Sequence, residues 1–546
     1  MIDNLTQTQR MVLALVLSFI FFIVWDFYFS PQKKALADVN QTIQTNAQNS
    51  SNIQAPMSTT TQVASNGNQT ALTTTNPINI ASPIVPSGAK TITTINAKNY
   101  KLTIDELGRI SKYEVLKENF KNEDGSYPNL VSPEFNLKPL EIRFKDAALN
   151  NEAFSQSYET DIKEINLDGN NSQTVILKQK LSVTEITKKI TFNSNGTYKL
   201  QISLTTPHEF FITPGFRPNI EADMYTFKGT LIVKSDGTIE TIEDGDAEGN
   251  EVFMGASILS SNDKYYTSTI YSFDNRINIF MSKDSEDRPL PFIKGNQNMT
   301  LDGYMGGKEY DKLHSIDPRL TDTIEYGFFT FMAKPVFLFL KYIHSILGNW
   351  GWSIVAITII IRFVLYPLTY KGMVSMNRLK ELSPKIKEIQ KQHKGEPQKM
   401  NAKMMELYKK NNANPMGGCL PMLLQIPVFF AIYRVLLNSI ELKHAEWIGW
   451  YTDLSVMDPY FVLPILMGAS MYWQQRITPT NFTDPMQEKI MRFLPIIFTF
   501  FFMTFPAGLT LYWFVNNLFS VAQQYYVNSI FDKEKARKEA VNNVES

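Results

Sequence analysis

The sequence is poor in the residues that form disulfides and metal sites. Its 546 residues include one cysteine and five histidines. A single cysteine, Cys419, excludes an internal disulfide, so a domain exported from the cytoplasm would depend on its packed core alone. The histidines fall in separate elements without metal-ligand spacing, and they are His208, His314, His344, His393 and His444. No metal ion or other cofactor is therefore expected.

Catalytic and nucleotide-binding signatures are missing as well. The chain has no Walker A, G-x-S-x-G or H-E-x-x-H motif. The acidic cluster from Asp244 to Gly249 resembles the opening of a calcium loop. However, the twelfth position would be Gly255, where a glutamate must supply two oxygens. We interpret the cluster as a solvated acidic turn and expect that the protein is not an enzyme.

The whole chain has a net charge of zero, but its charged residues are unevenly distributed. The 53 Lys and Arg residues balance 53 Asp and Glu residues. From position 331 onward there are 23 basic and 14 acidic residues, which leaves 30 and 39 for the first part. An acidic first part joined to a basic and apolar second part predicts two different compartments.

The first thirty residues predict a membrane anchor. Met11 to Phe29 is apolar apart from Ser18 and Asp26, and it is long enough to cross a hydrocarbon core of about 30 Å. The tripeptide 35–37 (Ala-Leu-Ala) resembles a signal-peptidase site, so cleavage is the alternative. Because the run exceeds the usual cleavable h-region of about 7–15 residues, we expect an uncleaved anchor over residues 1–30.

A polar segment and a β-rich domain follow the anchor. Residues 31–89 are rich in Ser, Thr, Asn and Gln with few aromatics, which predicts a flexible tether. Residues 90–326 contain short alternating runs between Asn, Gly and Asp turns, which predicts an all-β domain. The clearest runs are Thr91–Asn96, Lys101–Asp105, Thr174–Leu181, Lys189–Phe192, Tyr198–Leu204 and Thr230–Lys234.

Apolar stretches dominate the remainder of the chain. Residues 327–349 are amphipathic, with Lys334 and Lys341 among apolar residues, and we expect a helix lying at the membrane interface. Five further runs, all within residues 350–531, predict spans: Trp350–Tyr370, Leu420–Leu437, Tyr460–Trp473, Phe493–Phe505 and Leu509–Tyr526. With the anchor, they predict a multi-span α-helical membrane protein with six transmembrane helices. Only residues 506–508 separate the last two runs, which predicts a tight hairpin.

The loop over residues 371–416 predicts the orientation. It carries 11 basic and 4 acidic residues, and an excess of Lys and Arg marks the cytoplasmic side. Both termini, including the tail 532–546, would then be cytoplasmic, and the β-domain would lie outside, in the periplasm of a bacterium. Lys380–Gln392 and Gln398–Asn411 have helical periodicity, which predicts a helical hairpin. The hairpin is either a topology signal that contacts lipid headgroups or a docking surface for an acidic partner such as ribosomal RNA or a nascent-chain targeting factor.

Arg362 lies inside the first of these five runs, nine residues before Lys371. At 1.5 Å per residue it is roughly 13 Å from the cytoplasmic end, and a charge facing hydrocarbon costs at least a few kcal/mol. The other C-terminal runs hold no Asp or Glu. We therefore expect a water-filled groove in the membrane, lined by Arg362, Thr358, Gln425, Asn516, Ser520, Gln523 and Gln524. The alternative is that Gln425 and Asn516 only join helices through hydrogen bonds.

Ordered motifs in the second part resemble a known family. They are Gly348–Ser353, Arg362 with Tyr366–Leu368, residues 414–421, Gln425–Pro427, Asp458–Tyr460, Leu463–Gly468, Asp484–Met486 and Phe505–Leu509. In this order, over about 200 residues, they resemble the YidC membrane insertases of the YidC/Oxa family, in the Gram-negative form with a large periplasmic domain. The resemblance of the β-domain rests on layout and on fragments such as Tyr225–Gly229.

The resemblance implies an insertase and chaperone for newly made inner-membrane proteins, acting alone or beside the Sec translocon. Arg362 would attract the polar or acidic part of a substrate in a groove closed to the periplasm. The family would bind the ribosome, here through the basic loop, since the tail from Asp532 is nearly neutral. The periplasmic domain would be a β-supersandwich related to sugar mutarotases, and no small-molecule substrate is expected.

The resemblance also implies a hydrophobic slide for nascent segments. Carried over by motif position, its residues are Phe429, Met467 and Phe501. A tyrosine that contacts substrate in the family matches Trp513, so the aromatic contact is kept but the hydroxyl is lost. Soft apolar side chains suit variable hydrophobic partners, although ordinary lipid-facing or core packing explains many of them equally well.

Two other functions compete with this reading. A transporter would also have a charged cavity and spans interrupted by Pro427, Pro464 and Pro495, but it would show internal repeats, and the sequence shows none. A membrane-tethered periplasmic carbohydrate-binding protein or enzyme would need convergent carboxylates or histidines within residues 90–326, which the sequence does not display.

Overall fold

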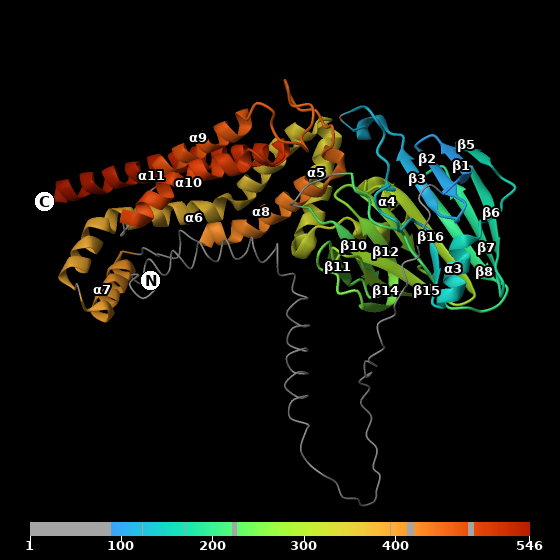
Figure 1. The fold of residues 1–546 in the computed structure, drawn as a ribbon. Helices are drawn as coiled ribbons and strands as arrows, with labels where there is room; N and C mark the ends of the chain where they lie inside the picture. Colours follow the sequence, from blue (N-terminus) through green and yellow to red (C-terminus); the bar gives the residue numbers. More distant parts are fainter. Residues whose placement is uncertain are drawn as a thin grey trace, which may run out of the picture.

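The computed structural model describes residues 89–545 except 123, 170, 221–225, 394, 412–419 and 479–484. The predicted anchor and all of the tether but Ala89 lie outside the described residues, as do Cys419 and Tyr225. The described chain has a β-rich domain at one end and an elongated group of helices at the other (Figure 1).

The β-rich domain contains two sheets. The smaller sheet has the order β3-β2-β1-β5 and is built from β1 (Thr91–Ala97), β2 (Tyr100–Asp105), β3 (Ile110–Val115) and β5 (Glu164–Leu167). The larger sheet has the order β4-β9-β15-β14-β12-β13-β16-β8-β7-β6, with β10 pairing both β11 and β12. The six runs predicted as strands are confirmed as parts of β1, β2, β6, β7, β8 and β10, although β6 ends at Lys180, one residue before the predicted end.

The strands of the larger sheet have these bounds: β4 (Ile142–Phe144), β6 (Ser172–Lys180), β7 (Glu185–Asn193), β8 (Thr197–Leu204), β9 (Phe210–Ile212), β10 (Gly229–Lys234), β11 (Ile239–Glu243), β12 (Val252–Asn262), β13 (Tyr266–Tyr271), β14 (Ile277–Lys283), β15 (Pro289–Gly295) and β16 (Asn298–Gly307). Alternate side chains of β7 are buried, as expected for strands with one face on a core.

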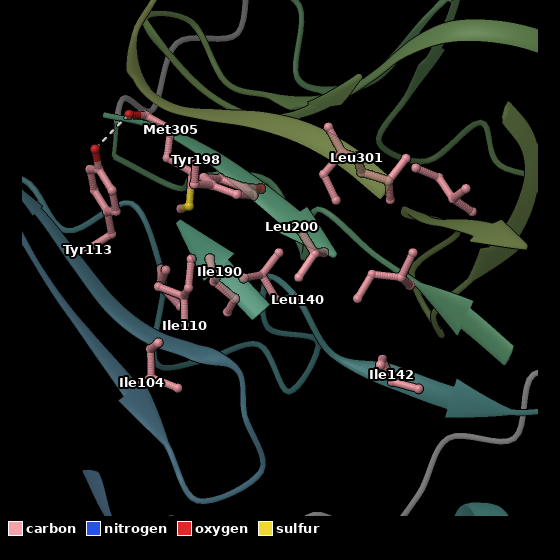
Figure 2. Close-up of a cluster of buried hydrophobic side chains, with 14 of the residues drawn as sticks. Ile104, Ile110, Tyr113, Leu140, Ile142, Ile190, Tyr198, Leu200, Leu301 and Met305 are labelled. Atoms are coloured by element: carbon pink, nitrogen blue, oxygen red, sulfur yellow. Dashed lines mark hydrogen bonds between the residues drawn. The ribbon is translucent and has the colours of Figure 1, made fainter. Parts of the chain in front are cut away.

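The two sheets bury a shared apolar core. Figure 2 shows Ile104 and Ile110 of the smaller sheet facing Ile190 and Leu200 of the larger one, and all four are fully buried. The hydroxyl of Tyr113 crosses between the sheets and donates to the carbonyl oxygen of Met305 at 2.7 Å. Because no disulfide is available, this burial is the main stabilisation of the domain.

The prediction of an all-β domain was wrong in one respect. Two α-helices lie within residues 90–326, α3 (Ala147–Ser155) and α4 (Tyr310–Ile316). The side chain of Asp146 accepts a hydrogen bond from the backbone N–H of Leu149 and caps α3, as acidic residues often do at a helix start. The domain is therefore β-rich and carries short helices on its connections.

The helical part follows from residue 330. Its helices are α5 (Thr330–Leu347), α6 (Trp350–Gln392), α7 (Pro397–Lys410), α8 (Leu420–Asn438), α9 (Val462–Ile477), α10 (Pro485–Phe502) and α11 (Ala507–Glu545). Figure 1 shows α6, α9, α10 and α11 running lengthwise, with α7 and the C-terminus at the end farthest from the β-rich domain.

Two of these helices are much longer than predicted, and α10 starts at Pro485, well before the predicted run Phe493–Phe505. The run Trp350–Tyr370 and the first hairpin helix are one continuous helix, α6, of 43 residues. Likewise, α11 continues beyond Tyr526 to Glu545, so the tail from Asp532 is helical. By length and composition, α6 alone among the helices of the described chain could cross a membrane. The count of six spans therefore stays a prediction.

Candidate functional site

Arg362 is buried between helices, with 6% of its surface exposed. Its Nε donates to Oδ1 of Asn516 at 2.6 Å, and its Nη2 donates to the backbone carbonyl of Asn516 at 3.3 Å. No carboxylate within the described residues pairs with it. A neutral side chain on α11 thus occupies the place where a counter-ion would be expected.

Gln425 makes this a junction of three helices. Its Nε2 on α8 donates to the same Oδ1 of Asn516, at 3.4 Å. The single amide oxygen of Asn516 therefore accepts hydrogen bonds from α6 and from α8. The structure brings together Arg362, Gln425 and Asn516, three of the predicted groove residues.

Two further predicted residues turn toward their own helices. The buried hydroxyl of Thr358 donates to the carbonyl of Ile354 at 2.6 Å. The hydroxyl of Ser520 donates to the backbone carbonyl of Asn516 at 2.9 Å. Such back-bonding satisfies a hydroxyl inside an apolar helix bundle, so these two hydroxyls do not join one helix to another.

The remaining two predicted residues, Gln523 and Gln524, have different hydrogen-bond surroundings. Gln523 is buried, and neither of its side-chain polar atoms has a partner among the residues described; buried amides of this kind usually bind water or another polar group. Gln524 instead donates to Oδ1 of Asn528 at 2.8 Å, as does Asn377 of α6 at 3.0 Å. The sequence reading missed Asn377 and Asn528, although Asn528 follows Gln524 at the i+4 spacing of one helix face.

The predicted slide residues lie in different environments. Phe429 of α8 meets Trp513 of α11 edge to face, with ring centroids 4.6 Å apart. Trp513 also contacts Phe502 at 5.3 Å. Phe501 is 46% exposed on α10, whereas Met467 on α9 is fully buried. Phe429 and Trp513 are thus in contact, and the other two lie apart, one on the surface and one in the core.

The loop after α8 covers the end of the helical part next to the β-rich domain. Ala507 and Gly508 donate their backbone N–H groups to the carbonyls of Val456 and Leu454, at 2.7 and 2.9 Å. A Cβ at Gly508 would stand 3.1 Å from the Leu454 oxygen, which explains the glycine at this close approach. The carboxylate of Asp458 accepts from the backbone N–H of Leu463 at 2.7 Å and fixes the start of α9.

A second arginine in an apolar run was also missed. Arg434 of α8 lies 4.0 Å from the carboxylate of Glu325, with both side chains mostly buried. The backbone carbonyl of Glu325 also accepts from Asn438 at 2.7 Å. The sequence signal was present, because Arg434 interrupts the apolar run Leu420–Leu437. Through Glu325, Arg434 and Asn438 attach α8 to the segment that leaves the β-rich domain.

The described residues contain no group of three or more His, Cys, Asp or Glu side chains that could hold a metal ion. The arrangement around Arg362 holds a cation and several amides, with no nucleophile and base in contact. Such a site can bind a polar or anionic group reversibly.

Comparison with known proteins identifies the family. A model of the YidC periplasmic domain matches residues 92–339, and a model of the 60Kd inner membrane protein matches residues 342–535. The membrane protein insertase YidC of Campylobacter jejuni is 49% identical over 98% of both chains. That of Wolinella succinogenes is 46% identical over 98% of this chain and 97% of its own. The chain belongs to the YidC insertase family.

The chain is therefore an inner-membrane protein with a periplasmic domain, and the predicted family is confirmed. The relatives carry the name of an insertase, which is a function without a catalysed bond change. A crystal structure of an active YidC insertase with its first transmembrane domain resolved matches 82% of this chain and 96% of its own. That match has 18% identity and a TM-score of 0.34, so the assignment rests on the sequence relatives.

Proposed function

We propose that this YidC family member inserts newly synthesised membrane proteins into the inner membrane and assists their folding. The observation that carries the proposal is the state of Arg362, a buried cation without an acidic partner in the described chain. A polar or acidic substrate segment that must cross the membrane would be stabilised by this charge, because charge-assisted hydrogen bonds strengthen where water is scarce.

The free energy that drives the substrate from water into the membrane comes from its own apolar segments. Its apolar segments leave water for lipid, which is favourable by roughly 25 cal/mol per Å² of apolar surface. Phe429 and Trp513 would contact such a segment, and Phe501 would meet it at the exposed surface of α10, whereas the fully buried Met467 would support the path from within the core. The covered side formed by residues 454–458 and 506–508 supports a groove that is closed to the periplasm and that admits substrate from the cytoplasm.

The finer topology and the partners belong to the same proposal. We expect six spans, cytoplasmic termini and a cytoplasmic hairpin over residues 371–416 that binds the ribosome. Lys399 and Lys403 are exposed on α7, each beside one glutamate, Glu396 and Glu406, and the excess of basic over acidic residues in this loop supports an acidic partner. The Sec translocon is the proposed partner for substrates that this protein does not insert alone. The transporter and carbohydrate-binding alternatives find no support in the names of the relatives.

The test is depletion of the protein in cells, followed by protease accessibility of a two-span substrate with an acidic periplasmic loop. We expect insertion of this substrate to fall with depletion, and normal insertion would contradict the proposal. Complementation then compares two variants of Arg362. We expect Arg362→Ala to lower insertion about tenfold or more, while Arg362→Lys keeps most of it. Equal loss in both would show that hydrogen-bond geometry, rather than positive charge, is what the arginine supplies.

A further inference from the structure

The hydrogen bonds of Arg362 all lie on one edge of its guanidinium group. Nε and Nη2 form the side edge, and both donate to Asn516, one to the amide oxygen and one to the backbone carbonyl. A guanidinium carries five N–H donors. The two N–H groups of Nη1 and the second one of Nη2 have no acceptor among the residues that the structure describes. The end edge of the group is therefore left for another acceptor.

A carboxylate fits that end edge. Arginine pairs with a carboxylate through two parallel N–H to oxygen bonds, along either its side edge or its end edge. Since Asn516 occupies the side edge, a substrate carboxylate can bind end-on without displacing it. Asn516 then fixes the direction in which the guanidinium points, and the carboxylate meets a group that is already oriented.

The neutrality of Asn516 matters as much as its geometry. A carboxylate at this position would accept the same hydrogen bonds, but it would also cancel the positive charge of Arg362. Removing that charge would remove the attraction for an acidic segment, since a buried ion pair is already compensated. An amide oxygen holds the guanidinium and leaves its charge available.

Two neighbouring amides show that the placement is specific. Asn517, the next residue on α11, donates from Nδ2 to the hydroxyl of Ser470 at 3.3 Å, and the hydrogen bonds of Arg362 in the described chain go to Asn516 instead. Gln425 donates to the oxygen of Asn516 instead of accepting from the arginine. By filling the second acceptor position of that oxygen, Gln425 helps to keep the Asn516 amide in one orientation.

We propose that Asn516 is the positioning residue of Arg362, and that its neutral amide sets the preference of the groove for substrates with acidic translocated segments. This inference rests on the proposed insertase function and specifies the residue through which the arginine acts. Asn516 holds the side edge of the guanidinium, and the end edge receives the substrate carboxylate.

The test compares Asn516→Asp with the wild type on a matched pair of two-span substrates. The two substrates differ only in the translocated loop, which holds two aspartates in one and two asparagines in the other. The quantity measured is the ratio of acidic-loop to neutral-loop insertion in depleted cells that carry each variant. We expect Asn516→Asp to lower this ratio about tenfold, because the new carboxylate forms an ion pair with Arg362 and neutralises its charge.

Asn517→Asp is the matched control, since it places the same carboxylate one residue along the same helix, against Ser470. Its ratio is expected to stay at the wild-type value. The amount of each variant in the membrane is measured by immunoblot, and the ratio is independent of that amount. A purely structural role of Asn516 would lower insertion of both substrates together and leave the ratio unchanged, which would overturn the inference.

The outcomes separate this inference from the function on which it rests. If depletion leaves both substrates inserted, the proposed function is wrong. If depletion blocks them and Arg362→Ala lowers the ratio while Asn516→Asp does not, the function stands and the positioning role of Asn516 is wrong. A ratio lowered equally by Asn517→Asp would also overturn it, because any nearby negative charge would then suffice.

Discussion

Individual buried charges in this chain are held by two different kinds of partner. In the β-rich domain, Arg109 lies between the carboxylates of Asp105 and Glu141 at 2.8 and 2.9 Å, and Arg143 pairs with Glu141 at 2.8 Å. All four side chains are almost fully buried, and their charges balance. In the helical part, the described residues offer Arg362 one side-chain amide oxygen and one backbone carbonyl, both from Asn516, and no carboxylate that would compensate its charge.

Lys188 is a third cation beside the balanced cluster. Its Nζ donates to the carbonyls of Gly108 and Leu140 at 3.0 and 2.8 Å. Desolvation lowers the pKa of Lys188 to about 7, since the nearby carboxylates only partly offset its burial. The lysine therefore ties the two sheets together most favourably when it is uncharged.

This arrangement predicts a pH dependence of domain stability. Between pH 7 and 9 the unfolded lysine keeps its proton, with an ordinary pKa near 10.5, while the folded lysine, with its pKa of about 7, loses the proton. Stability rises with pH where the unfolded state binds more protons. We expect the unfolding free energy of the wild type, relative to Lys188→Met, to rise by about 2 kcal/mol over this range.

The measurement is hydrogen exchange of the β-strand amides in the intact protein under denaturant, at the two pH values. At each pH the wild type is compared with Lys188→Met, which lacks the titrating group. Parallel stability profiles for the two proteins would contradict the assignment of a neutral lysine in the folded domain.

Whole helices pack closely where small residues allow it. Gly468 of α9 faces Thr499 of α10, and a Cβ at Gly468 would stand 1.8 Å from the Thr499 hydroxyl oxygen. Thr499 cannot withdraw freely, since its hydroxyl donates to the carbonyl of Pro495 at 2.8 Å. The distance between these two helices is therefore limited by one glycine.

Gly468→Ala should accordingly destabilise the helical part. Overpacking of this kind costs typically 1–3 kcal/mol, so we expect a lower midpoint of thermal unfolding in detergent. The double variant Gly468→Ala with Thr499→Ala should recover part of that loss, because the clashing hydroxyl is removed. If the second substitution adds to the loss instead, contact between the two residues does not limit the packing.

The two parts of the molecule meet at the loop after α8. The segment Ile440–Leu442 inserts against the β-rich domain, where Ile440 joins its apolar core. The carboxylate of Glu441 accepts from the backbone N–H of Tyr310 at 3.0 Å, at the start of α4. Burial, together with the charges of Glu309 and Asp311, raises the pKa of Glu441 to about 7, although the hydrogen bond from Tyr310 works in the opposite direction.

The junction should therefore respond to external pH. A carboxyl group whose pKa is raised on docking binds its proton more tightly in the docked state, so docking is favoured below pH 7 and weakens as the pH rises through 7. We expect amide exchange in residues 438–445 to increase from pH 6 to 8, after correction for intrinsic exchange rates. Glu441→Gln should abolish that increase, and an unchanged increase in the variant would assign the effect to another group.

Much of this organisation was readable from local features. The alternating runs predicted strands such as β6 and β8, and the apolar runs predicted the positions of α8 and α9, because periodicity reports which side of an element is buried. The length of α6 was not predicted. Residues 371–379 were expected to connect the span to the first hairpin helix, but they continue α6 without a break, and Asn377 is buried there, where it donates to Asn528 of α11.

The sequence by itself determined the acidic and basic parts, the family, and the isolation of Arg362 from any acidic residue in the apolar runs. These depend on composition and on spacing along the chain. Only the tertiary structure decided that Asn516 holds the arginine, that Gln425 supports Asn516, and that Gln524 belongs to a separate cluster with Asn377. Asn516 lies 154 residues from Arg362, and contact over such a separation depends on how α6, α8 and α11 are rotated against one another.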